Sequence, residues 1–120
     1  MFTNKDTKFF KEDEAIGLNE SLLMMLDCAR EEAGIPFHIT SGLRSEEKNK
    51  IVGGVENSAH LRGLAVDILC LDDTQEFFIK KGAFYAGFKR ILKGNNHIHL
   101  DIDETKPQNI CGLEKNYILK

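Results

Sequence analysis

The sequence predicts an α+β fold, a small single domain with two to three helices and a short sheet that contains antiparallel strands. Its 120 residues, 42% of them hydrophobic, match the size of one domain and can bury one core. Helical and strand-like patterns both occur, but not in the regular alternation that builds a parallel sheet. We therefore expect residues 1–120 to form one domain.

The composition argues against several classes of protein. A net charge of −3 and an isoelectric point near 5.8 make nucleic acid an unsuitable partner. No apolar run approaches the roughly 20 residues that a membrane span needs. The first residues lack the apolar segment of a secretory signal, so we expect synthesis in the cytoplasm. The cysteines form no Cys-x-x-Cys pair, which favours a reducing compartment.

The clearest predicted helix spans about residues 18–33. Asn19 or Ser21 can cap its start, and Gly34 followed by Pro36 ends it. Apolar residues recur at helical spacing along it. The predicted buried stripe consists of Leu22, Leu23, Leu26, Ala29 and Ala33.

Two strands and a helix start are predicted in the next part of the chain. Residues 36–40 are rich in β-branched and aromatic side chains and predict a short strand. Ser45, followed by acidic residues, indicates the start of a helix that Gly53-Gly54 breaks. Residues 64–71 are mostly apolar and predict a central strand.

The last third of the sequence predicts a helix and two more strands. The helix spans about residues 74–81 and is ended by Gly82. Residues 88–92 and 97–102 are predicted strands, joined by a turn at 93–96.

Asp67 is the first residue that points to a function. It lies between Val66 and Ile68 in an apolar strand, and a carboxylate is costly to bury there unless it is paired or bound to a cation. His60 precedes it across a loop that contains Gly63, where the backbone can bend sharply. The histidine and the aspartate can therefore converge.

A second polar group follows in the predicted strand 97–102. His97, His99 and Asp101 share one face of this strand, because side chains two residues apart point to the same side. Two histidines and one carboxylate leave a position open on zinc, as catalytic sites do. A salt-bridged aspartate and solvated histidines are the alternative explanation of these two groups.

The segment 58–67 resembles the Ser-x-His-x-x-Gly-x-Ala-x-Asp signature of the zinc D-alanyl-D-alanine carboxypeptidase family. Residues 40–45 resemble that family's Ser-Gly-aromatic-Arg-Ser/Thr element, with Leu43 in place of the aromatic residue. Residues 97–101 are similar to its closing His-x-His or Val-His-x-Asp element. The resemblance implies a hedgehog-like α+β fold and cleavage of bacterial cell-wall stem peptides. Its members include carboxypeptidases, dipeptidases and phage endolysins.

The resemblance also implies roles for individual residues. His60, Asp67 and His99 become the zinc ligands, and Arg44 becomes the group that binds substrate and stabilises the developing oxyanion. Ser58 is expected to support the loop or the ligands rather than to act as a nucleophile.

One position departs from the family pattern. Many members carry an acid three residues before the last ligand, where this chain has the neutral Asn96. His97 remains a candidate acid/base or transition-state donor, and Asp101 is expected to orient either His97 or His99. The other acids that we consider for the missing base are Glu56 and Asp103. The sequence leaves the general base unassigned.

We therefore predict a monomeric zinc peptidase that hydrolyses peptidoglycan stem peptides, as a D,D-carboxypeptidase or an endolysin-type endopeptidase. The alternative is a non-catalytic metal-binding domain that recognises cell wall or a protein partner, an option that Asn96 favours. A purely structural zinc site is disfavoured because a fourth protein ligand is missing. Without a secretory signal, action on the wall is explained by phage-type release through a membrane lesion or by a virion-borne enzyme. Neither nucleic acid nor membrane is expected as a partner.

Overall fold

A computed structural model describes residues 7–51 and 58–117, and the α+β fold is confirmed. The helices in these residues are α1 (Glu12–Ala15), α2 (Glu20–Ala33), α3 (Glu46–Ile51) and α4 (Asp73–Ala86). The strands are β1 (Ile39–Ser41), β2 (Ala65–Leu69), β3 (Arg90–Gly94), β4 (His97–Asp101) and β5 (Ile110–Leu113). Two short 3-10 helices are η2 (Ala59–Arg62) and η3 (Glu114–Asn116).

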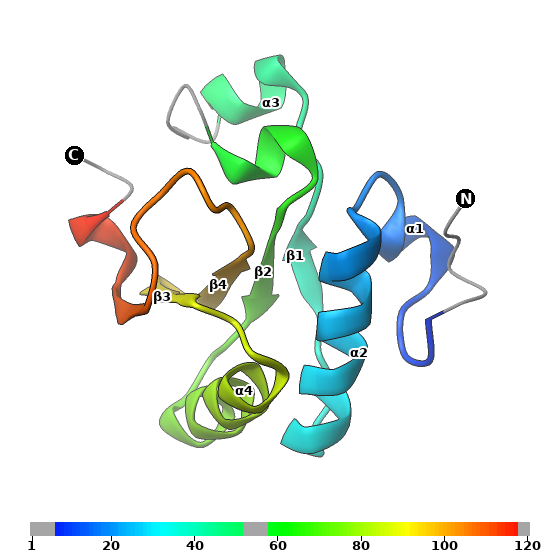
Figure 1. The fold of residues 1–120 in the computed structure, drawn as a ribbon, viewed down its shortest axis with the longest axis vertical. Coiled ribbons are helices and arrows are strands. Elements are labelled where there is room, and N and C mark those ends of the chain that lie inside the picture. The colour runs from blue at the N-terminus through cyan, green and yellow to red at the C-terminus, as the bar shows by residue number, and fades with distance from the viewer. Residues whose placement is uncertain (1–6, 52–57, 118–120) are drawn as a thin grey trace.

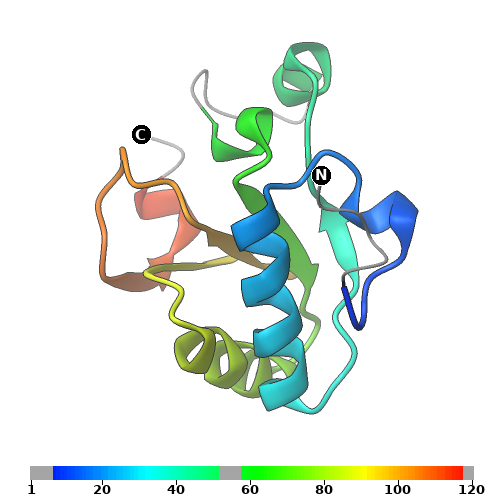
Figure 2. The same cartoon turned by 45° about the vertical axis from the view of Figure 1, so that its right-hand side comes forward.

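The strands form one mixed sheet in the order β1-β2-β4-β3-β5. Neighbouring strands are antiparallel, except that β5 runs parallel to β3. Helices α2 and α4 contact each other and pack on one face of the sheet, as Figures 1 and 2 show. The sheet residues of this core are Val66, Ile68, Ile91, Ile98 and Leu100. Residues that alternate with them, such as Asp67 and His99, face the other side.

Helix α2 begins and ends close to the predicted positions. The Asn19 side chain accepts hydrogen bonds from the backbone N–H groups of Ser21 and Leu22, at 2.8 and 3.3 Å. This places the cap at the first of the two predicted residues. Gly34 ends the helix with a φ of 72°, a left-handed conformation that favours glycine. The predicted stripe of this helix is buried.

The prediction that Gly82 ends the last helix is wrong, since α4 continues to Ala86 and ends at Gly87 with a φ of 92°. Gly82 instead lies where α4 crosses α2. A Cβ atom there would overlap the carbonyl oxygen of Ala29 and lie 3.1 Å from the Cβ atom of Ala33. The glycine allows close approach of two helices, a requirement that local sequence signals do not reveal.

Smaller differences concern the strands. Strand β1 occupies residues 39–41 rather than 36–40, and β3 extends to Gly94, so the hairpin turn is confined to Asn95 and Asn96. Neither β5 nor α1 was predicted. Gly53-Gly54, the predicted end of α3, lies outside the described residues. No helix in the described part of the chain is long and apolar enough to cross a membrane.

Replacing Gly82 with alanine tests the helix crossing. Alanine favours a helix by about 1 kcal/mol over glycine, yet its methyl group would force α4 away from the Ala29 backbone. We expect a net loss of about 1–2 kcal/mol in the free energy of unfolding. Lys81→Ala, at the exposed neighbouring position, is the control. Equal or greater stability of Gly82→Ala in urea denaturation would contradict this packing.

Candidate metal centre

Asp67 and His99 face each other across two paired strands. They are direct partners in the antiparallel register of β2 and β4, and side chains at such positions are close neighbours. The Oδ1 atom of Asp67 lies 3.0 Å from Nδ1 of His99. The two residues are 5% and 3% exposed. The strand register therefore builds a buried carboxylate–imidazole pair on the sheet face opposite α2 and α4.

His60 approaches the same carboxylate from η2, immediately before β2. Ser58 caps η2 by accepting a hydrogen bond from the His60 backbone, and Gly63 ends it with a φ of 69°. A Cβ atom at Gly63 would overlap the carbonyl oxygen of Gly17. The turn therefore requires glycine both for its positive φ and for this close approach. The Nε2 atom of His60 lies 3.3 Å from Oδ1 of Asp67.

Both imidazoles are oriented so that one nitrogen points into the cluster. The Nδ1 atom of His60 is 2.8 Å from the carbonyl oxygen of Gly42, to which it donates. The Nε2 atom of His99 is 2.6 Å from Oδ2 of Asp101, to which it donates in the same way. These outer bonds leave His60 Nε2 and His99 Nδ1 as the inner nitrogens, an arrangement typical of metal-ligating histidines.

The three inward atoms fit a metal ion. His60, Asp67 and His99 offer ligand atoms that all lie within 4.8 Å of one another. Although His60 Nε2 is near the carboxylate, it lacks hydrogen-bond geometry and is a buried atom without a partner among the described residues. A buried nitrogen in this state is costly unless something binds it. Two nitrogens and one carboxylate oxygen are a set that transition metals accept.

The electrostatics of the cluster favour a positive charge at its centre. Burial alone would raise the pKa of Asp67, but the nearby imidazoles of His60 and His99 hold it well below its usual range. Burial would lower the pKa of His99, but hydrogen bonds with Asp101 and Asp67 raise it to about 9. Without a metal, a proton on the His99 imidazole offsets part of the carboxylate charge, and a cation can take over that role.

The structure brings Arg44 to this cluster. Its Nη2 atom is 3.4 Å from Oδ2 of Asp67, the carboxylate oxygen that faces away from the imidazoles. Its Nε and Nη1 atoms donate to Ser41 and Asn49, each at 3.1 Å. The Arg44 backbone also donates to the His60 carbonyl at 3.0 Å. The guanidinium is therefore held firmly at the edge of the centre.

Asp101 contacts His99 rather than His97, and it is bound in turn by Arg90. The Nε atom of Arg90 lies 2.8 and 2.9 Å from the two oxygens of Asp101. The backbone N–H of Asp103 also donates to Asp101, at 3.0 Å. Sequence analysis missed Arg90, whose place depends on its register opposite Asp101 in the β3–β4 pair.

His97 lies on the same strand face as His99, as the alternation predicts, and contacts a carboxylate that sequence analysis missed. Its Nε2 atom is 3.0 Å from both oxygens of Glu114, at the start of η3. The Glu114 hydrogen bond raises the pKa of His97 despite partial burial. Asn96 is exposed in the hairpin turn with a φ of 65°. Glu56 lies outside the described residues.

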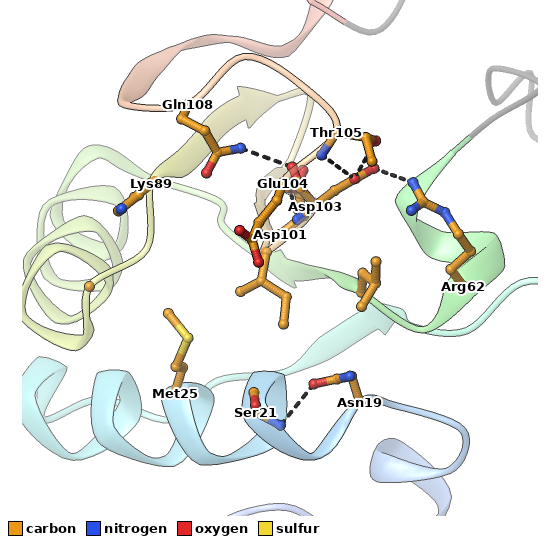
Figure 3. Close-up of a pocket in the computed structure, with 13 residues that line it drawn as sticks. Asn19, Ser21, Met25, Arg62, Lys89, Asp101, Asp103, Glu104, Thr105 and Gln108 are labelled. Atoms are coloured by element: carbon orange, nitrogen blue, oxygen red, sulfur yellow. Dashed lines mark hydrogen bonds and ion pairs between the residues drawn. The ribbon is translucent and has the colours of Figure 1, made fainter.

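Asp103 organises the loop after β4 and is not part of the cluster. Its carboxylate accepts bonds from Arg62 and from the backbone and hydroxyl of Thr105, as Figure 3 shows. Gln108 donates to the Asp103 carbonyl at 2.9 Å. These residues line a cavity of about 630 Å³ between the loop and α2. Asp101 reaches this cavity, but the three candidate ligands do not line it, so the candidate metal centre lies outside it.

Two inward imidazoles and a carboxylate on an α+β fold form a donor set that could hold a metal ion and leave a coordination position open. A family model described as Peptidase M15 matches residues 3–101, and the chain belongs to this family of metal-dependent peptidases. The resemblance to zinc D-alanyl-D-alanine carboxypeptidases is thereby confirmed. No curated protein matches the chain. The matched segment contains the three candidate ligands and ends before β5.

Asp101→Asn tests the support beneath His99. The change leaves the buried Arg90 guanidinium without its carboxylate, and breaking such a pair costs about 3–5 kcal/mol of folding free energy. Adding Arg90→Met should restore part of this loss, because it removes the buried guanidinium charge that no longer has a partner. Denaturation of the metal-free proteins measures both effects. Additive losses in the double variant would contradict the coupling.

Proposed function

We propose that this protein is a zinc peptidase that hydrolyses the peptide bonds of peptidoglycan stem peptides. The observation that carries the proposal is the convergence of His60 Nε2, Asp67 Oδ1 and His99 Nδ1 on one buried point. Three protein ligands with an open position are typical of catalytic rather than structural zinc. Membership of the peptidase M15 family supports the reaction class.

In this proposal the residues around the ligands bind and orient the substrate. When bound, zinc acts as a Lewis acid that polarises a carbonyl group and lowers the pKa of water. The Arg44 guanidinium is placed to hold a substrate carboxylate or the oxygen that becomes negative during the reaction. Asp101 fixes the His99 ring, and Gly42 fixes the His60 ring, so the two nitrogens stay aimed inward.

The first test is metal content together with hydrolysis. We expect one zinc ion per chain, and cleavage of purified peptidoglycan that chelation abolishes. His60→Ala should lose zinc and activity, whereas His38→Ala, at an exposed histidine before β1, should keep both. Full zinc content in His60→Ala would contradict the ligand assignment. Zinc binding without any hydrolysis would favour the non-catalytic alternative.

Hydrolysis of two different substrates distinguishes the two types of peptidase. Release of a terminal D-alanine from a soluble pentapeptide would identify a carboxypeptidase. Solubilisation of cross-linked peptidoglycan without that release would identify an endopeptidase.

Arg44→Ala tests the substrate-binding role. One such donor is typically worth about 10²-fold or more in turnover, so the rate should fall by this factor while zinc content is kept. Arg44→Lys should recover little, because lysine lacks the planar fork. Lys50→Ala, at an exposed cation of α3, is the control. Unchanged hydrolysis by Arg44→Ala would contradict the substrate-binding role and leave Arg44 only a structural role beside Asp67.

A further inference from the structure

The carboxylate of Glu114 joins the candidate metal centre from the part of the chain beyond the matched family segment. Strand β5 pairs in parallel with β3, with Leu113 opposite Lys93. Glu114 follows directly, level with Gly94, which is the β3–β4 partner of His97. The register of two strand pairs thus sets Glu114 beside His97.

Gly94 provides the space in which this pair meets. A Cβ atom there would overlap the His97 ring and lie 2.8 Å from Oε1 of Glu114. Any larger residue would push the imidazole and the carboxylate apart. The loop that leads to β5 is itself held by the bonds of Asp103 and by the 2.6 Å bond from Arg90 to the Pro107 carbonyl. The space at Gly94 and the bonds that hold the loop before β5 therefore both allow Glu114 to approach His97.

The Glu114 carboxylate lies between the buried ligands and solvent. Its Oε2 atom is 3.8 Å from Nδ1 of His99, the proposed ligand atom. Its side chain is 20% exposed, against 4% for His99. His97 Nε2 lies at 3.0 Å from both of its oxygens and orients the carboxylate. A water molecule and a substrate can therefore reach this group at the rim of the centre.

We propose that Glu114 is a catalytic residue whose carboxylate accepts a proton from the attacking water, and that His97 holds the carboxylate in place. This inference rests on the proposed peptidase function. The water oxygen forms a bond to the peptide carbonyl carbon while its proton moves to Glu114. The C–N bond then breaks, and the proton passes from Glu114 to the leaving nitrogen, which yields a carboxylic acid and an amine.

The surroundings favour this role over that of an additional metal ligand. Asp67, His97 and Glu114 also offer atoms within 4.8 Å of one another. However, Asp67 Oδ1 already belongs to the proposed centre with His60 and His99, and Arg44 lies 3.4 Å from its other oxygen. A carboxylate that is oriented but not buried suits proton transfer.

Glu114→Gln keeps the shape of the side chain and removes its basicity. We expect kcat on a soluble stem peptide to fall by about 10²–10⁴-fold. Zinc affinity, measured by competition with a chromophoric chelator, should stay unchanged, and Glu114→Asp should recover part of the rate. Glu104→Gln makes the same charge change at an exposed position in the preceding loop and serves as the control. Gly94→Ala should also lower kcat with zinc retained, because it displaces the pair.

Three results of these measurements would overturn the catalytic role of Glu114. Weakened zinc binding by Glu114→Gln would overturn it in favour of a ligand role. Wild-type rates in Glu114→Gln would overturn it and leave the peptidase function standing. A wild-type protein that binds zinc but cleaves no stem peptide would overturn the proposed function, and this inference with it.

Discussion

The cross-strand pairing of Asp67 with His99 is the constraint on which the rest of the site depends. Because the two residues are direct partners in the β2–β4 register, a slip of either strand by one residue would turn its polar side chain into the core and break the pair. The apolar residues Ile68 and Ile98, opposite each other on the core face, oppose such a slip. The hydrophobic contacts with α2 and α4 thereby hold the polar cluster in place on the other face.

The polar groups of the cluster are buried, so each needs a hydrogen-bond partner or a bound ligand. Asp101 shows how this is achieved, since it binds His99, Arg90 and the backbone of Asp103 at once. The same residue therefore orients a candidate ligand and begins the loop that carries Glu114 back to the site. The exception is His60 Nε2, which is buried yet unpaired among the described atoms. An unsatisfied atom amid otherwise complete bonding marks the point that a ligand is expected to fill.

Local signals in the sequence predict the parts of the structure that depend on neighbouring residues. The α2 caps and an aspartate inside an apolar strand are of this kind, and both were found at their predicted places. Features that depend on distant segments were missed, because nothing adjacent to them encodes their surroundings. Gly82 is set by a helix crossing, Arg90 by the β3–β4 register, and Glu114 by the pairing of the short, half-exposed strand β5 that precedes it. The resemblance did not reveal Glu114 either, since it ends before β5.

Anomalous diffraction from crystals of the zinc-loaded protein tests most directly whether His60, Asp67 and His99 bind one zinc ion. We expect one peak at the zinc absorption edge, about 2.0–2.2 Å from His60 Nε2, Asp67 Oδ1 and His99 Nδ1. The Nε2 atom of His99 should remain bonded to Asp101. A peak held by Asp67, His97 and Glu114 instead, or the absence of any peak between the two imidazoles, would contradict it.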